Sequence, residues 1–251
     1  MLNLVRADLY RIFHGKLIKV SCFLTIGWVL LCSYAQKATL DIREYLTGSE
    51  VTADYWNAFF NYYPVVIPLV IFCSYFVSND FRQGTVKLYI EKGISRWKYC
   101  FSKLVVSWLA TAMFLIIAFG TGILCNKVFF DFAATPYMTY SSILSYVLCQ
   151  ILFHMSVATL VTAVVLVIKN SAFSMAINFI FVLFGYLVLH GLEQIFNLDY
   201  AITMFWAFSN INKTRFDTSQ QWLPVAVIVF IGYNLIWGGI SGLIFKKRDI
   251  S

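Results

Sequence analysis

Charged residues are scarce in this sequence. Asp, Glu, Lys and Arg make up 12% of its 251 residues, whereas 60% are hydrophobic and the mean hydropathy is +0.75. Soluble domains carry about 25% charged residues, and they do not repeat apolar runs of about 18 residues or more along the whole chain. The composition therefore excludes an ordinary soluble domain and predicts a polytopic membrane protein.

Motifs for cofactor and metal chemistry are also missing. No stretch fits the pattern Gly-x-x-x-x-Gly-Lys-Ser/Thr, in which backbone N–H groups and a lysine bind the phosphates of ATP. The six cysteines are scattered singly with no Cys-x-x-Cys pair, which is typical of small apolar core residues rather than of disulfides or metal ligands. We therefore expect no enzyme activity, no cofactor and no metal on this chain.

Six apolar runs predict six membrane-spanning helices, and acidic residues are absent from all of them. The predicted spans cover residues 17–34, 62–78, 104–125, 143–168, 172–190 and 223–245. Pro64 and Pro68 predict a kink in the second span. Ion-coupled carriers usually keep a titratable group within the membrane, so proton-coupled transport is disfavoured, while sodium sites built from carbonyls and hydroxyls remain open. His154 and His190 are typical of packed, hydrogen-bonded histidines.

The distribution of basic residues predicts the orientation of these spans. With both termini in the cytoplasm, 14 of the 19 Lys and Arg residues lie on the cytoplasmic side and 5 lie outside. This asymmetry follows the positive-inside rule, and it accounts for the basic pI of about 9.1 without any nucleic-acid partner. We therefore expect an all-α, multi-pass protein of the cell membrane, with residues 1–251 forming one transmembrane domain in contact with the lipid bilayer.

Two segments are predicted to lie on the membrane without crossing it. Residues 1–16 repeat apolar residues at helical spacing, which indicates an interfacial helix leading into the first span. The charged residues of this helix lie mostly on its other side: Arg6, Asp8, Arg11 and Lys16. On the outside, segment 191–222 contains an apolar run, 200–211, that is too short to span the membrane and too apolar for an open loop. This run predicts a re-entrant or interfacial hairpin between the fifth and sixth spans.

The most charged stretch of the chain, residues 79–103, connects the second and third predicted spans. It holds eight charged residues, six of them basic. Asp80 with Gln83 fits a capping box and Gly93 suits a left-handed stop, so the pattern predicts a short helix over 81–92. Apolar residues recur along it at helical spacing: Val86, Tyr89, Ile90 and Ile94. A merely solvated loop needs no such caps. We therefore interpret this connector as a docking helix for a soluble partner, with a solvated loop as the alternative.

The connector resembles the first cytoplasmic loop of the type-2 ATP-binding-cassette (ABC) exporter permeases. In that family an acidic residue precedes a Gly-Thr pair and a basic residue, and a Ser-Arg pair follows a turn or two later. The matching residues here are Asp80, Gly84, Thr85, Lys87, Ser95 and Arg96. One departure is that the acidic residue is often glutamate in the family and is aspartate in this chain. The resemblance implies a coupling helix whose contacts with an ATPase involve Asp80, Arg82, Gly84, Thr85, Lys87, Glu91, Gly93, Ser95 and Arg96.

The whole chain is similar to that family in outline, with an amphipathic N-terminal helix, six spans and an external re-entrant segment. The resemblance implies the permease subunit of an ATP-driven exporter, which moves a hydrophobic or amphipathic substrate such as an antimicrobial peptide. It also implies two copies of a cytoplasmic ABC ATPase carrying ATP and Mg²⁺, and a second permease chain, identical or paralogous. Aromatic residues gather at the predicted outer face, as an interfacial belt or as a surface for the substrate. The residues expected along the substrate path are Tyr62, Tyr63, Phe205 and Trp206.

Three other functions fit parts of the sequence. A secondary transporter or channel would work without an ATPase, and a membrane scaffold or sensor would bind a partner without moving cargo. A Gly-Ile-Ser-Gly motif around Ser241 matches that of intramembrane serine proteases. The base would have to be His154 or His190, and Ser241 lies only four residues from the inner boundary of its span, which disfavours a protease. Gly238 and Gly242 instead form a small-residue pair for close helix packing.

Overall fold

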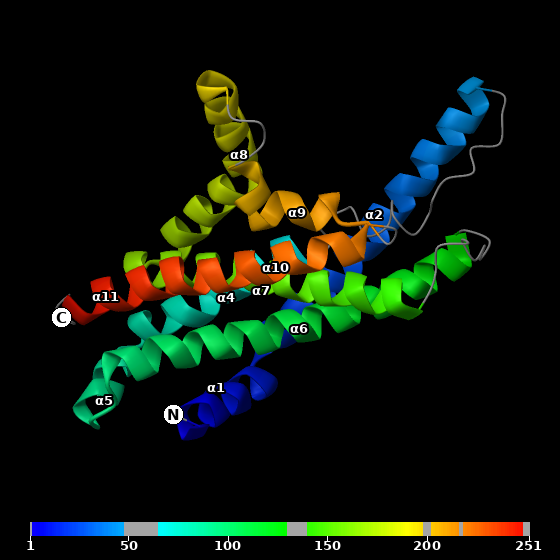
Figure 1. Cartoon of the computed structure of the whole chain (residues 1–251). Coiled ribbons are helices and arrows are strands. Elements are labelled where there is room, and N and C mark those ends of the chain that lie inside the picture. The colour runs from blue at the N-terminus through cyan, green and yellow to red at the C-terminus, as the bar shows by residue number, and fades with distance from the viewer. Residues whose placement is uncertain (1, 48–64, 130–139, 198–201, 216–217, 248–251) are drawn as a thin grey trace.

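The computed structural model describes residues 2–47, 65–129, 140–197, 202–215 and 218–247. All regular structure in these ranges is helical (Figure 1). The helices are α1 (Leu2–His14), α2 (Lys16–Thr47), α4 (Val66–Arg82), α5 (Thr85–Glu91), α6 (Arg96–Phe129), α7 (Tyr140–Ile168), α8 (Ser171–Phe196), η1 (Thr203–Phe205), α9 (Ala207–Lys213), α10 (Ser219–Tyr233), η2 (Asn234–Gly238) and α11 (Gly239–Lys247). The protein is therefore all-helical over the described residues.

Five helical stretches are long and apolar enough to cross a membrane. They cover residues 16–39 of α2, all of α6, α7 and α8, and residues 219–246 of the continuous helix from α10 to α11. The second predicted span, 62–78, overlaps the 17-residue helix α4 over residues 66–78. Pro68 lies in the first turn of α4, where a missing N–H breaks no helical hydrogen bond. Pro64 lies outside the described residues.

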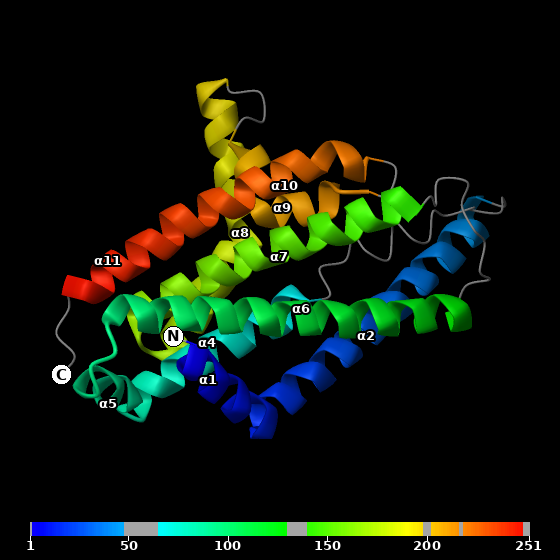
Figure 2. The same cartoon turned by 60° about the horizontal axis from the view of Figure 1, so that its bottom comes forward.

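Helix α7 forms the centre of the bundle. It contacts α4, α6, α8, α9, α10 and α11, and Figures 1 and 2 both show it running between α6 and α10. Several of its polar side chains form hydrogen bonds within the bundle. The Thr162 hydroxyl donates to Ser107 Oγ on α6 at 2.9 Å, and the His154 ring bonds its own helix at Gln150 O at 2.8 Å. His154 is therefore a packed, hydrogen-bonded core residue, as predicted.

The last long helix packs on α6 through glycine. A Cβ atom on Gly242 would lie 2.2 Å from the ring of Trp97, and one on Gly238 would lie 3.4 Å from Leu104 Cδ1. Both partners belong to α6. The nearby Ser241 is buried, and its hydroxyl donates to Gly238 O at 3.0 Å. The prediction of a small-residue packing face at Gly238 and Gly242 is confirmed.

The segment after α8 folds back onto the bundle. Glu193, near the end of α8, accepts hydrogen bonds from the backbone N–H groups of Ile202 and Thr203 at 2.7 and 2.6 Å. Helix α9 then packs against α7, where Ile211 is buried and its carbonyl accepts from Gln150 Nε2 at 3.0 Å. The described part of segment 191–222 is therefore mostly helical, and it is joined to the bundle by hydrogen bonds.

Candidate functional site

The charged connector contains a short helix, but it begins later than predicted. Helix α4 continues through Asp80 to Arg82, and Gly84 then adopts a left-handed conformation with φ of 66°. Gly84, not Asp80, is the residue that precedes the first turn of α5. The expected capping box of Asp80 and Gln83 is therefore wrong, because the chain is still in α4 at Asp80.

The other end of α5 matches the expectation. Gly93 has φ of +81°, its N–H donates to Ile90 O at 2.9 Å, and the N–H of Ile94 donates to Tyr89 O at 3.1 Å. This pair of bonds is the Schellman arrangement, which requires a left-handed residue after the helix. Ser95 Oγ then accepts from the backbone N–H of Lys98 at 3.4 Å and caps α6. Both predictions are confirmed, and left-handed glycines bound α5 on either side.

Helix α5 has one packed face and one open face. Val86 is buried and packs into the core, with Tyr89 and Ile90 partly buried beside it. The exposed residues of α5 and its C-cap are Lys87, Leu88, Glu91 and Lys92. Leu88 is 54% exposed although it is apolar. The predicted amphipathic pattern is confirmed, and Leu88 is an apolar side chain that α5 presents outward.

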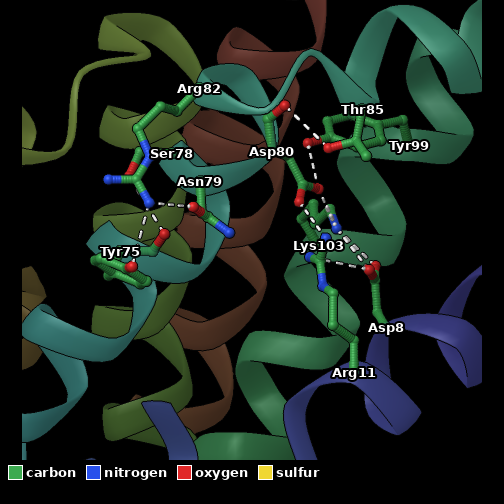
Figure 3. Close-up of polar contacts among 10 residues, drawn as sticks. All are labelled: Asp8, Arg11, Tyr75, Ser78, Asn79, Asp80, Arg82, Thr85, Tyr99 and Lys103. Atoms are coloured by element: carbon green, nitrogen blue, oxygen red, sulfur yellow. Dashed lines mark hydrogen bonds and ion pairs between the residues drawn. The ribbon is translucent and has the colours of Figure 1, made fainter. Parts of the chain in front are cut away.

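Asp80 lies in a buried cluster of ion pairs instead of at the surface. Its Oδ2 atom is 2.6 Å from Lys103 Nζ, its Oδ1 atom is 2.6 Å from Arg11 Nη1, and Tyr99 donates to Oδ2 at 3.1 Å. Lys103 also reaches both carboxylate oxygens of Asp8, at 2.7 and 2.8 Å. Figure 3 shows these side chains converging from α1, α4 and α6. We call Asp8, Arg11, Asp80 and Lys103 the ion-pair cluster.

One member of the cluster differs from its expected position. The periodicity of the N-terminal helix predicts Asp8 on its polar side, but Asp8 is buried on the same stripe as Leu4 and Ile12, four residues before and after it. This expectation is wrong because the partner of Asp8, Lys103, lies on a helix far away in the sequence. The side chain of Lys103 is itself fully buried.

The cluster is electrically balanced, with two carboxylates and two bases. Such balance is needed because an unpaired buried charge is costly. Burial raises the pKa of the Asp8 carboxyl, although Lys103 opposes that shift. Lys103 Nζ also lies over the rings of Phe76 and Tyr99, 4.7 and 5.1 Å from their centroids. The cluster therefore ties the start of the chain to Asp80 near the end of α4, five residues before the first residue of α5.

Aromatic rings fill the space between α5 and the rest of the bundle. Tyr99 lies 6.1 Å from Tyr89 of α5, 6.5 Å from Phe81 of α4 and 5.6 Å from Phe245 of α11, measured between ring centroids. Thr85, the first residue of α5, donates its hydroxyl to Asp80 O at 3.0 Å. Helix α5 is thus held on its inner side by rings and by a hydrogen bond to the residue that anchors the ion-pair cluster.

Arg96 has a structural role in this chain. Its guanidinium donates to the carbonyl oxygens of Phe245 and Lys246 at 3.3 and 2.8 Å. These carbonyls belong to the last turn of α11, which has no helical N–H partners for them. Arg96 therefore joins the start of α6 to the end of α11, and replacing it would disturb the bundle as well as any contact with a partner.

The predicted coupling residues fall into three groups. Gly84, Gly93 and Ser95 shape the backbone, while Asp80, Thr85 and Arg96 make contacts inside the protein. Arg82, Lys87 and Glu91 are exposed, and Arg82 donates to Asn79 Oδ1 at 2.8 Å and to Tyr75 Oη at 3.3 Å. The surface that a partner could reach is therefore smaller than the sequence predicted.

The residues predicted for a substrate path are not brought to this site. Tyr62 and Tyr63 lie outside the described residues. Phe205 is 56% exposed, whereas Trp206 packs over Gly185 of α8, where a Cβ atom would lie 2.4 Å from its ring. His190, also near the end of α8, stacks on Tyr186 with ring centroids 5.6 Å apart.

Comparison with known proteins gives a family but no activity. A family model described as a protein of unknown function, DUF2705, matches residues 20–251. The chain belongs to the DUF2705 family. The matched region contains Asp80, Lys103 and all of α5, and it begins after α1. No curated protein matches the chain. Among the described residues of this DUF2705 protein, no group of three or more His, Cys, Asp or Glu side chains could hold a metal ion.

Proposed function

We propose that this protein is the permease subunit of an ATP-driven ABC exporter and that α5 is its coupling helix. The observation that carries the proposal is the two-sided character of α5. Its inner face is fixed by Val86, Tyr89 and the ring of Tyr99, while Lys87, Leu88 and Glu91 face outward. A helix held this firmly on one side and open on the other is suited to receive a partner and to pass on its movement.

The contacts of α5 give a route for that movement. Force on α5 would act through Gly84 on α4 and through Gly93 and Ser95 on α6. The ion-pair cluster links the same end of α4 to α1 and α6. An ATPase that pushes on α5 would therefore move three helices together. Since the sequence contains no Gly-x-x-x-x-Gly-Lys-Ser/Thr motif for binding the phosphates of ATP, ATP and Mg²⁺ would be bound by two copies of a cytoplasmic ATPase.

In this proposal the α5 end faces the cytoplasm. The start of α1, helix α5 and the end of α11 lie at the same end of the molecule (Figures 1 and 2). Helix α1, the connector 79–103 and α11 together carry 10 of the 19 Lys and Arg residues, and cytoplasmic segments are rich in bases. Both termini would then be cytoplasmic, with six spans if α4 also crosses the cell membrane. Segment 191–222 would be the external re-entrant part.

The cargo would be hydrophobic or amphipathic, such as an antimicrobial peptide. A cavity of about 360 Å³ between α7, α8 and α11 supports this class, because its lining is apolar apart from Ser241. The outward side of α8 is also apolar, with Ile180, Leu183 and Leu187 about 60% exposed. That side would face lipid or the second permease chain, identical or paralogous. Phe205 and Trp206, with Tyr62 and Tyr63, remain the proposed outer path.

Co-purification tests the proposal. The tagged chain is extracted from its own membranes in mild detergent, and the proteins that accompany it are identified by mass spectrometry. We expect a Walker-A ATPase with the natural chain and with Leu88→Met, and its loss with Leu88→Asp, because a carboxylate would replace the exposed apolar contact. Arg6→Asp, an exposed change on α1, is the matched control and should retain the ATPase. A natural chain that arrives without any ATPase would contradict the proposal and favour a gradient-driven carrier or a scaffold.

A further inference from the structure

A second feature of the α5 end is a polar cavity on the opposite side of α4 from the ion-pair cluster. Its volume is about 480 Å³, within the range of ligand pockets. The residues that line it come from α4, α5 and the α7–α8 turn, and they include Tyr75, Asn79, Arg82, Lys87, Lys169 and Asn170. Figure 3 shows Arg82 and Tyr75 on one side of α4 and Asp80 with Arg11 on the other.

The charge of this cavity has one sign. Arg82, Lys87 and Lys169 give it three formal positive charges, and no Asp or Glu is among the described residues that line it. The ion-pair cluster lies on the other side of α4, and it contains two carboxylates beside its two bases (Figure 3).

The hydrogen-bonding groups of the cavity also suit an anion. Arg82 is held in place by Asn79 Oδ1 and Tyr75 Oη, so part of its rotamer freedom is already lost. The side chain of Asn170 caps α8 by accepting from Phe173 N–H at 3.2 Å, and the first N–H groups of this 26-residue helix lie at the cavity wall with Ser171. Lys169 takes a left-handed conformation with φ of 66°, where glycine or asparagine is usual.

We propose that this cavity binds a phosphate group, most directly that of an anionic phospholipid headgroup. Guanidinium, ammonium and hydroxyl donors recognise phosphate, and the described lining of this cavity supplies all three without a carboxylate. The cavity lies where α4 and α7 end and α8 begins, which is the depth of the headgroups if these helices cross the membrane. Bound phosphate would connect α5 to the α7–α8 turn through Lys87 and Lys169. This inference does not depend on the ATPase.

Native mass spectrometry of the purified full chain in a neutral detergent tests the proposal. Phosphatidylglycerol, phosphatidylcholine and inorganic phosphate are each titrated, and the fraction of lipid-bound protein is measured. We expect phosphatidylglycerol to be retained in preference to phosphatidylcholine, which carries no net charge. The double variant Arg82→Gln with Lys169→Asn should weaken phosphatidylglycerol binding by about tenfold, because two charge-assisted contacts are lost. Asparagine accepts the left-handed conformation, so this variant should fold.

The controls distinguish a lipid headgroup from a soluble phosphate compound, and they show whether the cavity binds phosphate at all. Lys92→Gln, an exposed base of the same connector that does not line the cavity, should change the affinity less than twofold, about the effect of a distant surface charge. Binding of inorganic phosphate at low concentration, with no phosphatidylglycerol retained, would assign the site to a soluble phosphate compound. Equal loss in the Lys92→Gln control, or no preference for phosphatidylglycerol and no binding of phosphate, would overturn the proposal.

Discussion

Lys103 Nζ lies 2.6 Å from Asp80 Oδ2, and neither side chain is exposed to solvent. The two residues sit at opposite ends of the charged connector, one in α4 and the other in α6. Their pairing brings the connector into a closed loop from which α5 projects. The shape of the candidate site therefore depends on a buried contact that the surface does not reveal.

Removal of Lys103 should destabilise the protein strongly. Lys103→Met leaves Asp8 and Asp80 with only Arg11 as a base, and breaking a buried pair in this way costs about 3–5 kcal/mol. Adding Asp8→Asn should restore most of the loss, because the remaining Arg11 and Asp80 are still paired. The free energy of unfolding in detergent, measured by denaturant titration, checks both effects. Lys98→Met, an exposed change on the same helix, is the control. A Lys103→Met variant as stable as this control would contradict the role of the cluster.

The stability of the protein should depend on pH through Asp8. Because the pKa of Asp8 is raised in the folded protein, the folded state binds this proton more tightly than the unfolded state. The stabilisation linked to that proton is present below the ordinary pKa of about 4 and is lost as pH rises through the raised value. Compared with Asp8→Asn, the natural chain should therefore lose stability between pH 4 and neutrality. Thermal unfolding of both proteins against pH measures this difference, and a natural chain that gains stability relative to the variant over that range would show the opposite shift.

The two glycines that flank α5 should resist substitution. Gly84 and Gly93 have φ of 66° and 81°, where a Cβ atom costs about 1–2 kcal/mol. Gly84→Ala and Gly93→Ala should each lower the free energy of unfolding by about that amount. Gly120→Ala in α6 is the matched control, since open space surrounds that helical position, and it should stabilise by about 0.5–1 kcal/mol. Equal effects at all three positions would mean that the left-handed turns carry no cost.

A side chain at Gly242 should weaken the packing of α11 on α6 and so destabilise the protein. The Trp97 ring occupies the space of a Cβ atom at Gly242, so Gly242→Ala should cost about 1–3 kcal/mol through overpacking. A second change, Trp97→Leu, should recover part of this loss by opening the space. Gly239→Ala on the same helix has no neighbour within 4 Å of its Cβ position and serves as the control. If thermal unfolding shows the same midpoint for both alanine variants, the packing account is wrong.

Local patterns in the sequence predicted local structure well. The helix over the connector, the left-handed stop at Gly93 and the cap at Ser95 depend on residues within five positions of each other. Long apolar runs likewise predicted the stretches in α2, α6, α7, α8 and α10–α11 that are able to cross a membrane. The number of spans stays a prediction, because α4, with 17 residues, is not among the five helices that are long and apolar enough to cross a membrane.

Contacts between distant residues could not be predicted in the same way. Asp8 and Lys103 are 95 positions apart, and the helical periodicity of the N-terminal segment predicts Asp8 on its polar side. A signal was present, because Asp8 falls on the same stripe as Leu4 and Ile12 and so belongs to the apolar face by spacing. Arg96 is similar: the carbonyl oxygens it binds lie 149 and 150 positions later, and no local pattern identifies them.

Site-specific photo-crosslinking in living cells tests the central claim most directly. A photoreactive amino acid is placed at Leu88, on the open face of α5, or at Tyr140, which is 95% exposed at the start of α7. The account predicts that irradiation joins the chain to a Walker-A ATPase from position 88 and not from position 140, because Tyr140 would lie on the outer side. Crosslinks to an ATPase from neither position, or equally from both, would contradict the assignment of α5 as the coupling helix.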